Sequence, residues 1–139
     1  MCNLYERELV VKNEDDIYKA IVMTQDLLRH TSFNEEDQTL IQLAAEEAST
    51  NAFKYCSQDK IIVKWKISLE YLIVEVWQKG QIFSISASQN VNTTSSGRGL
   101  PLIIGIMDEV HLAQREGWVG LVLTKNMDAT KKEVVEYVN

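Results

Sequence analysis

Residues 46–55 read EEASTNAFKY, and this stretch decides how the rest of the chain is arranged. A helical period places Ala48, Ala52 and Tyr55 on the face expected to meet the core, and Glu47 and Asn51 lie on that face too, one turn apart. A carboxylate and an amide within an apolar stripe cost free energy unless something pairs with them. Either another part of the protein satisfies both groups, or this face of the helix borders a polar ligand.

Composition indicates an ordinary globular domain and argues against two classes of partner. The chain has 139 residues, of which 45% are hydrophobic and 24% charged, with a net charge of −6. This length predicts one domain with a substantial core. No cluster of Lys and Arg offers a footprint for nucleic acid, and an anionic membrane surface would repel the chain. We therefore expect neither direct nucleic-acid binding nor membrane binding.

The cellular compartment is inferred from the absence of targeting signals. No run is long enough for a transmembrane helix, and the first residues lack the pattern of a signal peptide, so a cytoplasmic location is expected. Cys2 and Cys56 are then predicted to be free thiols. Cys56 is either reactive or a semi-buried thiol, and the second is the commoner state of cysteine. With only His30 and His111 besides, a zinc site is not expected.

Hydrophobic periodicity predicts eight regular elements. Asn34 has the residue type of a helix N-cap, and Glu35, Glu36 and Asp37 follow it. The strands are expected at residues 4–11, 61–67, 71–78, 110–114 and 119–125, and the helices at 17–30, 34–55 and 102–109. Helices packed on one face of a mixed, mainly antiparallel sheet make a two-layer α/β sandwich of the α+β class. We expect the domain to span residues 1–128 and a tail to span 129–139.

Two features of these elements bear on a site. The apolar positions of the second helix are rich in alanine, which implies that another backbone or a ligand approaches closely; they are Leu40, Ile41, Leu43, Ala44, Ala48 and Ala52. In the strand at 71–78 the two-residue period places Gln78 on the same interior face as Leu72, Val74 and Val76. Gln78 is thus a second polar side chain directed at the interior.

A polar segment at residues 84–96, with a possible short extended piece at 82–85, leads into the sequence SSGRGLPLI. Long loops within a compact domain tend to be either functional lids or disordered segments. Gly97 and Gly99 bracket Arg98 and open a helix near Leu100, with Pro101 tolerated in its first turn. Free backbone N–H groups at such a helix start can bind an anion, although two glycines there are as often only a tight turn.

Glu47 and Asn51 supply complementary chemistry. An amide oxygen can hold one position of an octahedral Mg²⁺ whose other ligands are phosphates and waters. A glutamate one turn away can orient or deprotonate the group that attacks a γ-phosphate. The alternative is a buried polar pair that hydrogen bonds to backbone.

The order of four motifs resembles the anti-sigma factor serine/threonine kinases, a branch of the GHKL ATPases (gyrase, Hsp90, histidine kinase, MutL). The motifs are EEASTNAFKY, VEVWQKGQIF, SGRGLPLI followed by MDEV, and VLTK, and they cover essentially the whole chain. The resemblance implies the Bergerat two-layer sandwich and a bacterial protein that is usually a homodimer. It also implies binding of a sigma factor or other client protein, or phosphorylation of a STAS-domain anti-anti-sigma protein with Mg-ATP.

The resemblance also assigns roles to individual residues. Glu47 matches the catalytic glutamate, and Asn51 the asparagine that holds magnesium. Thr124 matches a threonine beside the adenine, and residues 84–96 match the ATP lid, which closes with Ser96. The loop that grips the phosphates is matched by Gly97, Arg98, Gly99 and Leu100.

One motif departs from the family pattern. The first glycine box has the form Asp-x-Gly-x-Gly, in which the aspartate accepts a hydrogen bond from the adenine amino group. Here Gln78 stands in place of the aspartate, Gly80 is retained, and Ile82 replaces the second glycine. Gln78 keeps an acceptor oxygen, loses the charge and gains an N–H donor. The loss of a charge-assisted bond would cost about 1–3 kcal/mol, or roughly ten- to a hundredfold in affinity.

Three interpretations remain open from the sequence. The first is a working kinase with weakened or altered nucleotide preference, which Glu47, Asn51 and the glycine loop favour. The second is a sequestering regulator that has lost ATP binding, which Gln78 and Ile82 favour. The third is a small interaction domain without a ligand, for which only the modest size speaks. The retained Glu47 favours the kinase, because a binding module has little need of a carboxylate there.

Overall fold

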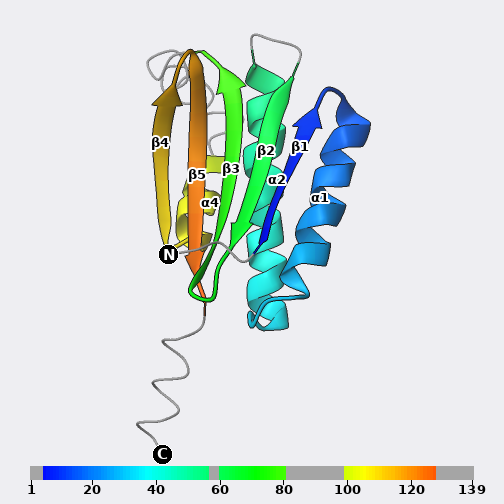
Figure 1. Cartoon of the computed structure of the whole chain (residues 1–139), viewed down its shortest axis with the longest axis vertical. Helices are drawn as coiled ribbons and strands as arrows, with labels where there is room; N and C mark the ends of the chain where they lie inside the picture. The colour runs from blue at the N-terminus through cyan, green and yellow to red at the C-terminus, as the bar shows by residue number, and fades with distance from the viewer. Residues whose placement is uncertain (1–4, 57–59, 81–98, 128–139) are drawn as a thin grey trace, which may run out of the picture.

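A computed structural model describes residues 5–56, 60–80 and 99–127. Figure 1 shows one twisted sheet with its helices gathered on one face. The order and type of the predicted elements are confirmed. Their bounds are β1 Tyr5–Val11, α1 Glu14–Leu28, α2 Glu35–Tyr55, β2 Ile61–Ile67, β3 Tyr71–Lys79, α4 Gly99–Ile106, β4 Glu109–Arg115 and β5 Trp118–Asn126. The predicted lid at 84–96, the extended piece at 82–85 and the tail at 129–139 lie outside the described residues.

The sheet has the strand order β1-β2-β3-β5-β4, and every described pairing is antiparallel. The sequence predicted a mixed sheet, but the pairings among these five strands are all antiparallel. Two tight hairpins, β2–β3 and β4–β5, account for two of the four pairings. Glu116 and Gly117 make the second turn with positive φ angles of 44° and 85°. The long-range pairing of β3 with β5 brings residues 71–79 beside residues 118–126 at the centre of the sheet.

Both long helices begin at an asparagine cap. The Asn13 side chain accepts a hydrogen bond from the Asp16 backbone N–H at 2.9 Å, and the Asn34 side chain accepts one from that of Asp37 at 2.7 Å. Each cap satisfies a backbone donor that the first helical turn leaves without a partner. The predicted role of Asn34 is confirmed, and this cap fixes the start of the helix that carries Glu47 and Asn51.

The core lies between the sheet and the helices, and it is apolar apart from a few bonded polar groups. Trp65 is buried and donates its ring N–H to the Thr24 hydroxyl at 3.0 Å, which ties β2 to α1. On α2 the buried residues are Ile41, Ala44, Ala45, Ala48 and Ser49. Leu40 and Leu43, two of the apolar positions of this helix, are 37% and 39% exposed and lie outside the core. The helix packs through its small residues.

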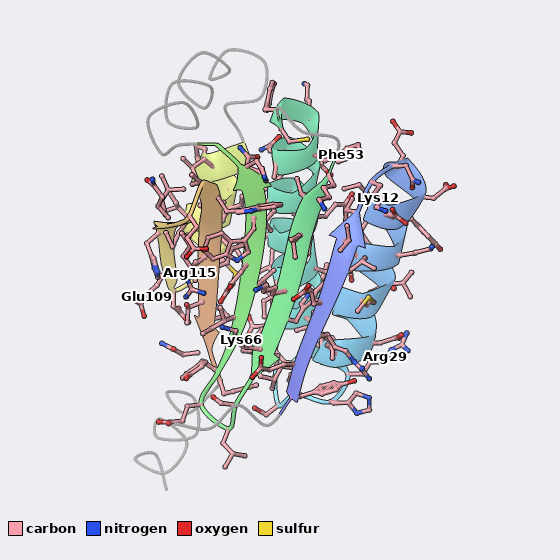
Figure 2. The ribbon with its side chains drawn as sticks, turned by 45° about the horizontal axis from the view of Figure 1, so that its top comes forward. Lys12, Arg29, Phe53, Lys66, Glu109 and Arg115 are labelled. Carbon is pink, nitrogen blue, oxygen red and sulfur yellow. The ribbon has the colours of Figure 1, made fainter. Side chains whose placement is uncertain are left out.

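The face of the sheet that is turned away from the helices carries Lys66 and Arg115 (Figure 2). On this face Glu75 accepts a hydrogen bond from Trp77 Nε1 at 2.8 Å and lies 3.0 Å from Lys66 Nζ. Burial raises the pKa of Glu75, but the bonds from Trp77 and Lys66 outweigh burial, and the net pKa is below its usual value.

We expect Glu75→Gln to lower the free energy of unfolding at pH 7 by roughly 1–3 kcal/mol, because it removes a charge-assisted bond to Lys66. A lowered folded pKa stabilises the fold above the unfolded pKa, and this contribution is lost as the pH falls through the folded pKa. The difference between wild type and variant should therefore shrink below about pH 4.5. Urea unfolding at several pH values measures it. Glu8→Gln removes an exposed pair with Lys64 and should cost under about 1 kcal/mol.

No helix in residues 5–56, 60–80 or 99–127 is long and apolar enough to cross a membrane.

Candidate nucleotide site

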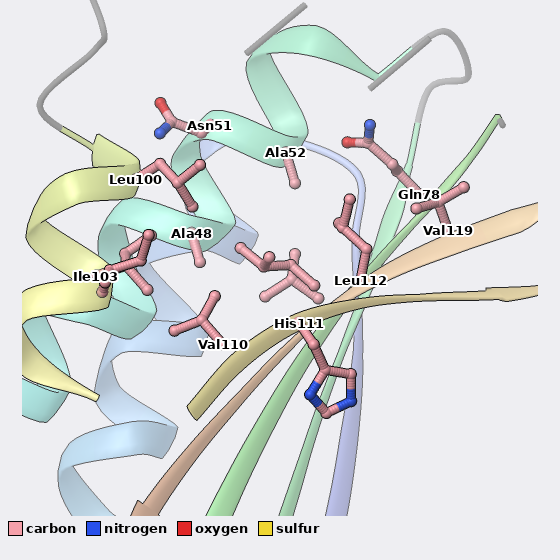
Figure 3. A pocket seen from close by; sticks show the side chains of 13 residues that line it. Ala48, Asn51, Ala52, Gln78, Leu100, Ile103, Val110, His111, Leu112 and Val119 are labelled. Atoms are coloured by element: carbon pink, nitrogen blue, oxygen red, sulfur yellow. The ribbon is translucent and has the colours of Figure 1, made fainter. Parts of the chain in front are cut away.

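A cavity of about 350 Å³ opens between α2, α4 and the strands β3, β5 and β4. This volume is in the range of small-molecule sites. Figure 3 shows the side chains that surround it. Among the described residues, the lining is mainly aliphatic and includes no Asp, Glu, Lys or Arg. The lining residues are Ala48, Asn51, Ala52, Val76, Gln78, Leu100, Ile103, Ile104, Val110, His111, Leu112, Val119 and Leu121.

Helix α2 positions Asn51 and Glu47 one turn apart, as the sequence predicts. A methyl group at Gly99 would collide with the amide nitrogen of Asn51 and would lie 3.5 Å from Glu47 Oε1. The first residue of α4 therefore lies directly against both side chains. Gly99 is buried and permits this approach because it has no Cβ. The alanine-rich face of α2 thus borders both a neighbouring backbone and a cavity, which the sequence left as alternatives.

Within the described part of the chain, the side chains of Glu47, Asn51 and Gln78 have no hydrogen-bond or ion-pair partner. No described side-chain nitrogen or oxygen is fully buried without a partner, so these polar groups retain access to solvent. Polar groups at a cavity that the protein itself does not satisfy are available to a ligand. The described residues thus offer no internal partner to Glu47 and Asn51, and the second alternative from the sequence, a polar ligand, gains support.

Gln78 lies near the end of β3 on the face that packs against the helices. It is 8% exposed and pairs with Val119 of β5 in the sheet. In Figure 3 Gln78 and Asn51 lie on opposite sides of Ala52, so the cavity has an amide toward each side. The predicted orientation of Gln78 toward the interior is confirmed.

The other predicted site residues divide into three groups. Leu100, in the first turn of α4, lines the cavity, whereas Glu47 stands beside Gly99 and is not part of the lining. Gly80 has a φ of 148° and donates its N–H to the Gly117 carbonyl at 2.9 Å, so it closes the end of β3. The phosphate-loop residues Ser96, Gly97 and Arg98 lie outside the described residues.

Thr124 is directed away from the cavity, and its predicted place beside a base is not supported by the register. It pairs with Ile73 and Glu109, whereas the residues of β5 that line the cavity are Val119 and Leu121. Side chains alternate between the two faces of a strand, so Thr124 lies on the face opposite to Leu121. Its backbone carbonyl accepts a hydrogen bond from Asp108, which helps to join α4 to β5.

Strand β4 contributes a wall that sequence reasoning missed. Val110 and Leu112 line the cavity, and the ring of His111, between them in the strand, points away from it (Figure 3). The only sequence signal for this wall was the apolar alternation in residues 110–112.

Lys125 of β5 holds the C-terminal end of α4. It donates to the Ile106 carbonyl at 2.9 Å and lies 3.7 Å from Asp108.

Two further predictions concern metals and thiols. Cys56 is half-buried, and its thiol donates to the Phe53 carbonyl at 3.1 Å, in agreement with a semi-buried thiol. Cys2 is outside the described residues. In the three described segments, no group of three or more His, Cys, Asp or Glu side chains is placed to hold a metal ion.

Comparison with known proteins identifies the family. A family model described as the histidine kinase-like ATPase domain matches residues 10–125. The chain belongs to this family. The match covers α2 and all of β5 except Asn126, and thus every described residue around the cavity. A comparison with curated proteins found no match to this chain.

Two solved structures share the fold at low sequence identity. The structure of the SiaB–SiaC complex from Pseudomonas aeruginosa matches with a TM-score of 0.67 and 9% identity, over 88% of this chain and 89% of that chain. The structure of the RsbU and RsbW domains of a protein from Mycobacterium tuberculosis matches with a TM-score of 0.62 and 16% identity. That alignment covers 87% of this chain and 32% of the other. Both matches confirm the two-layer α+β architecture.

Proposed function

We propose that this histidine kinase-like ATPase domain is a cytoplasmic regulator of a partner-switching system. It binds a sigma factor or other client protein, and it phosphorylates a STAS-domain anti-anti-sigma protein with Mg-ATP. The observation that carries the proposal is one cavity bordered by Asn51 and Gln78, with Glu47 and Gly99 beside Asn51. We place this function in residues 1–128, with 129–139 as a tail, and infer a homodimer from the resemblance to the kinase family.

The residues present fit a magnesium nucleotide. The Asn51 amide oxygen is a hard ligand of the kind that Mg²⁺ accepts, together with phosphate oxygens and waters. The aliphatic lining suits the faces of a base, and Gln78 offers hydrogen bonds to its edge. When bound, Mg-ATP supplies the phosphoryl group, and the metal neutralises charge on the phosphates. Gly99 begins α4, and the backbone N–H groups in the first turn of a helix have no partner within the helix and can meet an anion, apart from Pro101, which has no N–H.

Glu47 is proposed to accept the proton of the attacking hydroxyl. It is half-buried on α2, close to Gly99, and has no described partner that would hold it away from a substrate. A carboxylate in this position can orient a Ser or Thr hydroxyl of a partner protein and take its proton as phosphate is transferred. Its place beside the cavity, rather than in the lining, suits a group that faces the phosphate end and an incoming protein.

The relatives support a role in protein binding. The SiaB structure was solved as a complex with SiaC, and the second structure joins an RsbW domain to an RsbU domain. Each thus pairs a fold of this kind with a second protein or domain. We infer by analogy that this chain also acts on a protein partner.

Gln78 favours one alternative, a regulator that sequesters its client without ATP. A neutral amide replaces the acidic residue of the family pattern, and a weakened nucleotide site is the expected consequence. In this alternative, binding of the client does not change when Mg-ATP is added.

The two functions differ in one experiment. The purified chain is incubated with Mg-ATP and a STAS-domain protein, and phosphoserine or phosphothreonine on the STAS protein is measured by mass spectrometry. We expect phosphate on one hydroxyl residue, and release of the client in an ATP-dependent manner. Binding of the client that is unchanged by Mg-ATP, with no phosphate transferred, would instead establish the sequestering function.

A further inference from the structure

Gln78 holds a position from which it can set base selectivity. The residue is 8% exposed, and its side chain borders the cavity and has no hydrogen-bond partner in the described part of the chain. Its neighbours in the lining, Val76, Val119 and Leu121, offer no polar group. An amide in these surroundings gains most from a ligand edge that presents one donor beside one acceptor.

We propose that the cavity binds adenine and guanine nucleotides with similar affinity, and that Gln78 is the residue responsible. This inference rests on the proposed nucleotide-binding function. The amide oxygen can accept from the adenine amino group while the amide N–H donates to a ring nitrogen. Turned over, the same amide can donate to the guanine O6 and accept from its N1–H. A carboxylate has acceptors only, so it pairs with the adenine amino group and repels the guanine O6.

The surroundings allow the amide to adopt both orientations. No described neighbour donates to or accepts from Gln78, so the described residues favour neither orientation of its amide. The aliphatic lining contacts the faces of a ring without distinguishing its edge groups. Among the described lining residues near Gln78, recognition of the edge is thus left to this one side chain, which is complementary to both purines. This predicts a ratio of ATP to GTP affinity within about tenfold, since the two modes make the same number of hydrogen bonds.

The test is isothermal titration calorimetry with ATP and GTP, each with Mg²⁺, on wild type and Gln78→Glu. Gln78→Glu keeps the length of the side chain but removes its donor, and it should raise the ratio of ATP to GTP affinity about ten- to a hundredfold. Gln42→Glu adds the same charge in the groove between α1 and α2 and should leave the ratio unchanged. Circular dichroism confirms that each variant is folded.

The outcomes separate the inference from the function it rests on. Similar affinities in wild type, with ATP preference in Gln78→Glu, support both. Wild type that prefers ATP by more than about tenfold, or a ratio unmoved by Gln78→Glu, would overturn the selectivity and leave nucleotide binding intact. Absence of binding by either nucleotide to folded wild type would overturn both.

Discussion

Gly99→Ala should reduce the affinity for Mg-ATP by about ten- to a hundredfold while the chain stays folded. The added methyl group would collide with the Asn51 amide nitrogen, which is the far end of a side chain that can rotate away. Relief of the collision costs little stability, but it removes the proposed magnesium ligand from its place. Loss of the one interaction between Asn51 and the charged magnesium ion accounts for a ten- to hundredfold loss of affinity, at roughly 1–3 kcal/mol.

Gly105→Ala is the matched control for this prediction. Gly105 belongs to the same helix, α4, and a methyl group there would meet nothing within 4 Å. Alanine in a helix interior should raise stability by up to about 1 kcal/mol and leave binding unchanged. Calorimetry measures affinity, and thermal unfolding measures stability. Equal affinities for wild type and Gly99→Ala would show that the contact of α4 with Asn51 has no part in the site.

Glu47→Gln should lower the rate of phosphate transfer to a STAS-domain protein by about 10²–10⁴, the usual contribution of a general base. The substitution keeps the shape of the side chain and removes its ability to accept a proton. Because Glu47 does not line the cavity, nucleotide affinity should change only a few fold. Single-turnover transfer with labelled ATP gives the rate, and a separate titration gives the affinity.

Glu46→Gln provides the comparison for Glu47→Gln. Glu46 is the preceding residue of α2 and is equally half-buried, but successive residues in a helix point in different directions. We expect its transfer rate to match that of wild type. Transfer that persists in Glu47→Gln, or an equal loss in both variants, would exclude Glu47 as the proton acceptor.

Local sequence signals predicted most of the fold. Alternation in residues 61–67 and 71–78 predicted a hairpin that the structure confirms, and Asn34 was correctly placed as a helix cap. These features depend on neighbours in sequence. The insertion of β5 between β3 and β4 depends on pairing between distant segments, for which periodicity carries no signal.

Apolar residue type alone does not decide burial on α2. Leu40 and Leu43 are apolar but exposed, because the helix packs through smaller residues such as Ala44 and Ala48. The place of Thr124 beside the base came from the resemblance to the kinase family, and the strand register does not support it, because Thr124 lies on the face opposite to Leu121. A shift of one residue in a strand moves every side chain to the other face.

The candidate site could be predicted in part. One helical turn placed Glu47 beside Asn51, and the two-residue period directed Gln78 inward, as the structure confirms. The contact of Gly99 with Asn51 joins residues far apart in sequence, and only the resemblance to the kinase family had linked them. Predicting that β4 forms one wall of the cavity requires the strand order of the sheet, which local sequence patterns do not give.

The most direct test of this account is calorimetric titration of ATP with and without Mg²⁺ into wild type and Asn51→Ala. We predict binding to wild type that requires Mg²⁺, and affinity at least tenfold weaker in Asn51→Ala. Asn126→Ala, which changes an exposed asparagine at the end of β5, should bind as wild type does. Folded wild-type protein that binds no ATP, or binds it equally well in Asn51→Ala, would contradict the proposal that this cavity is a magnesium-nucleotide site.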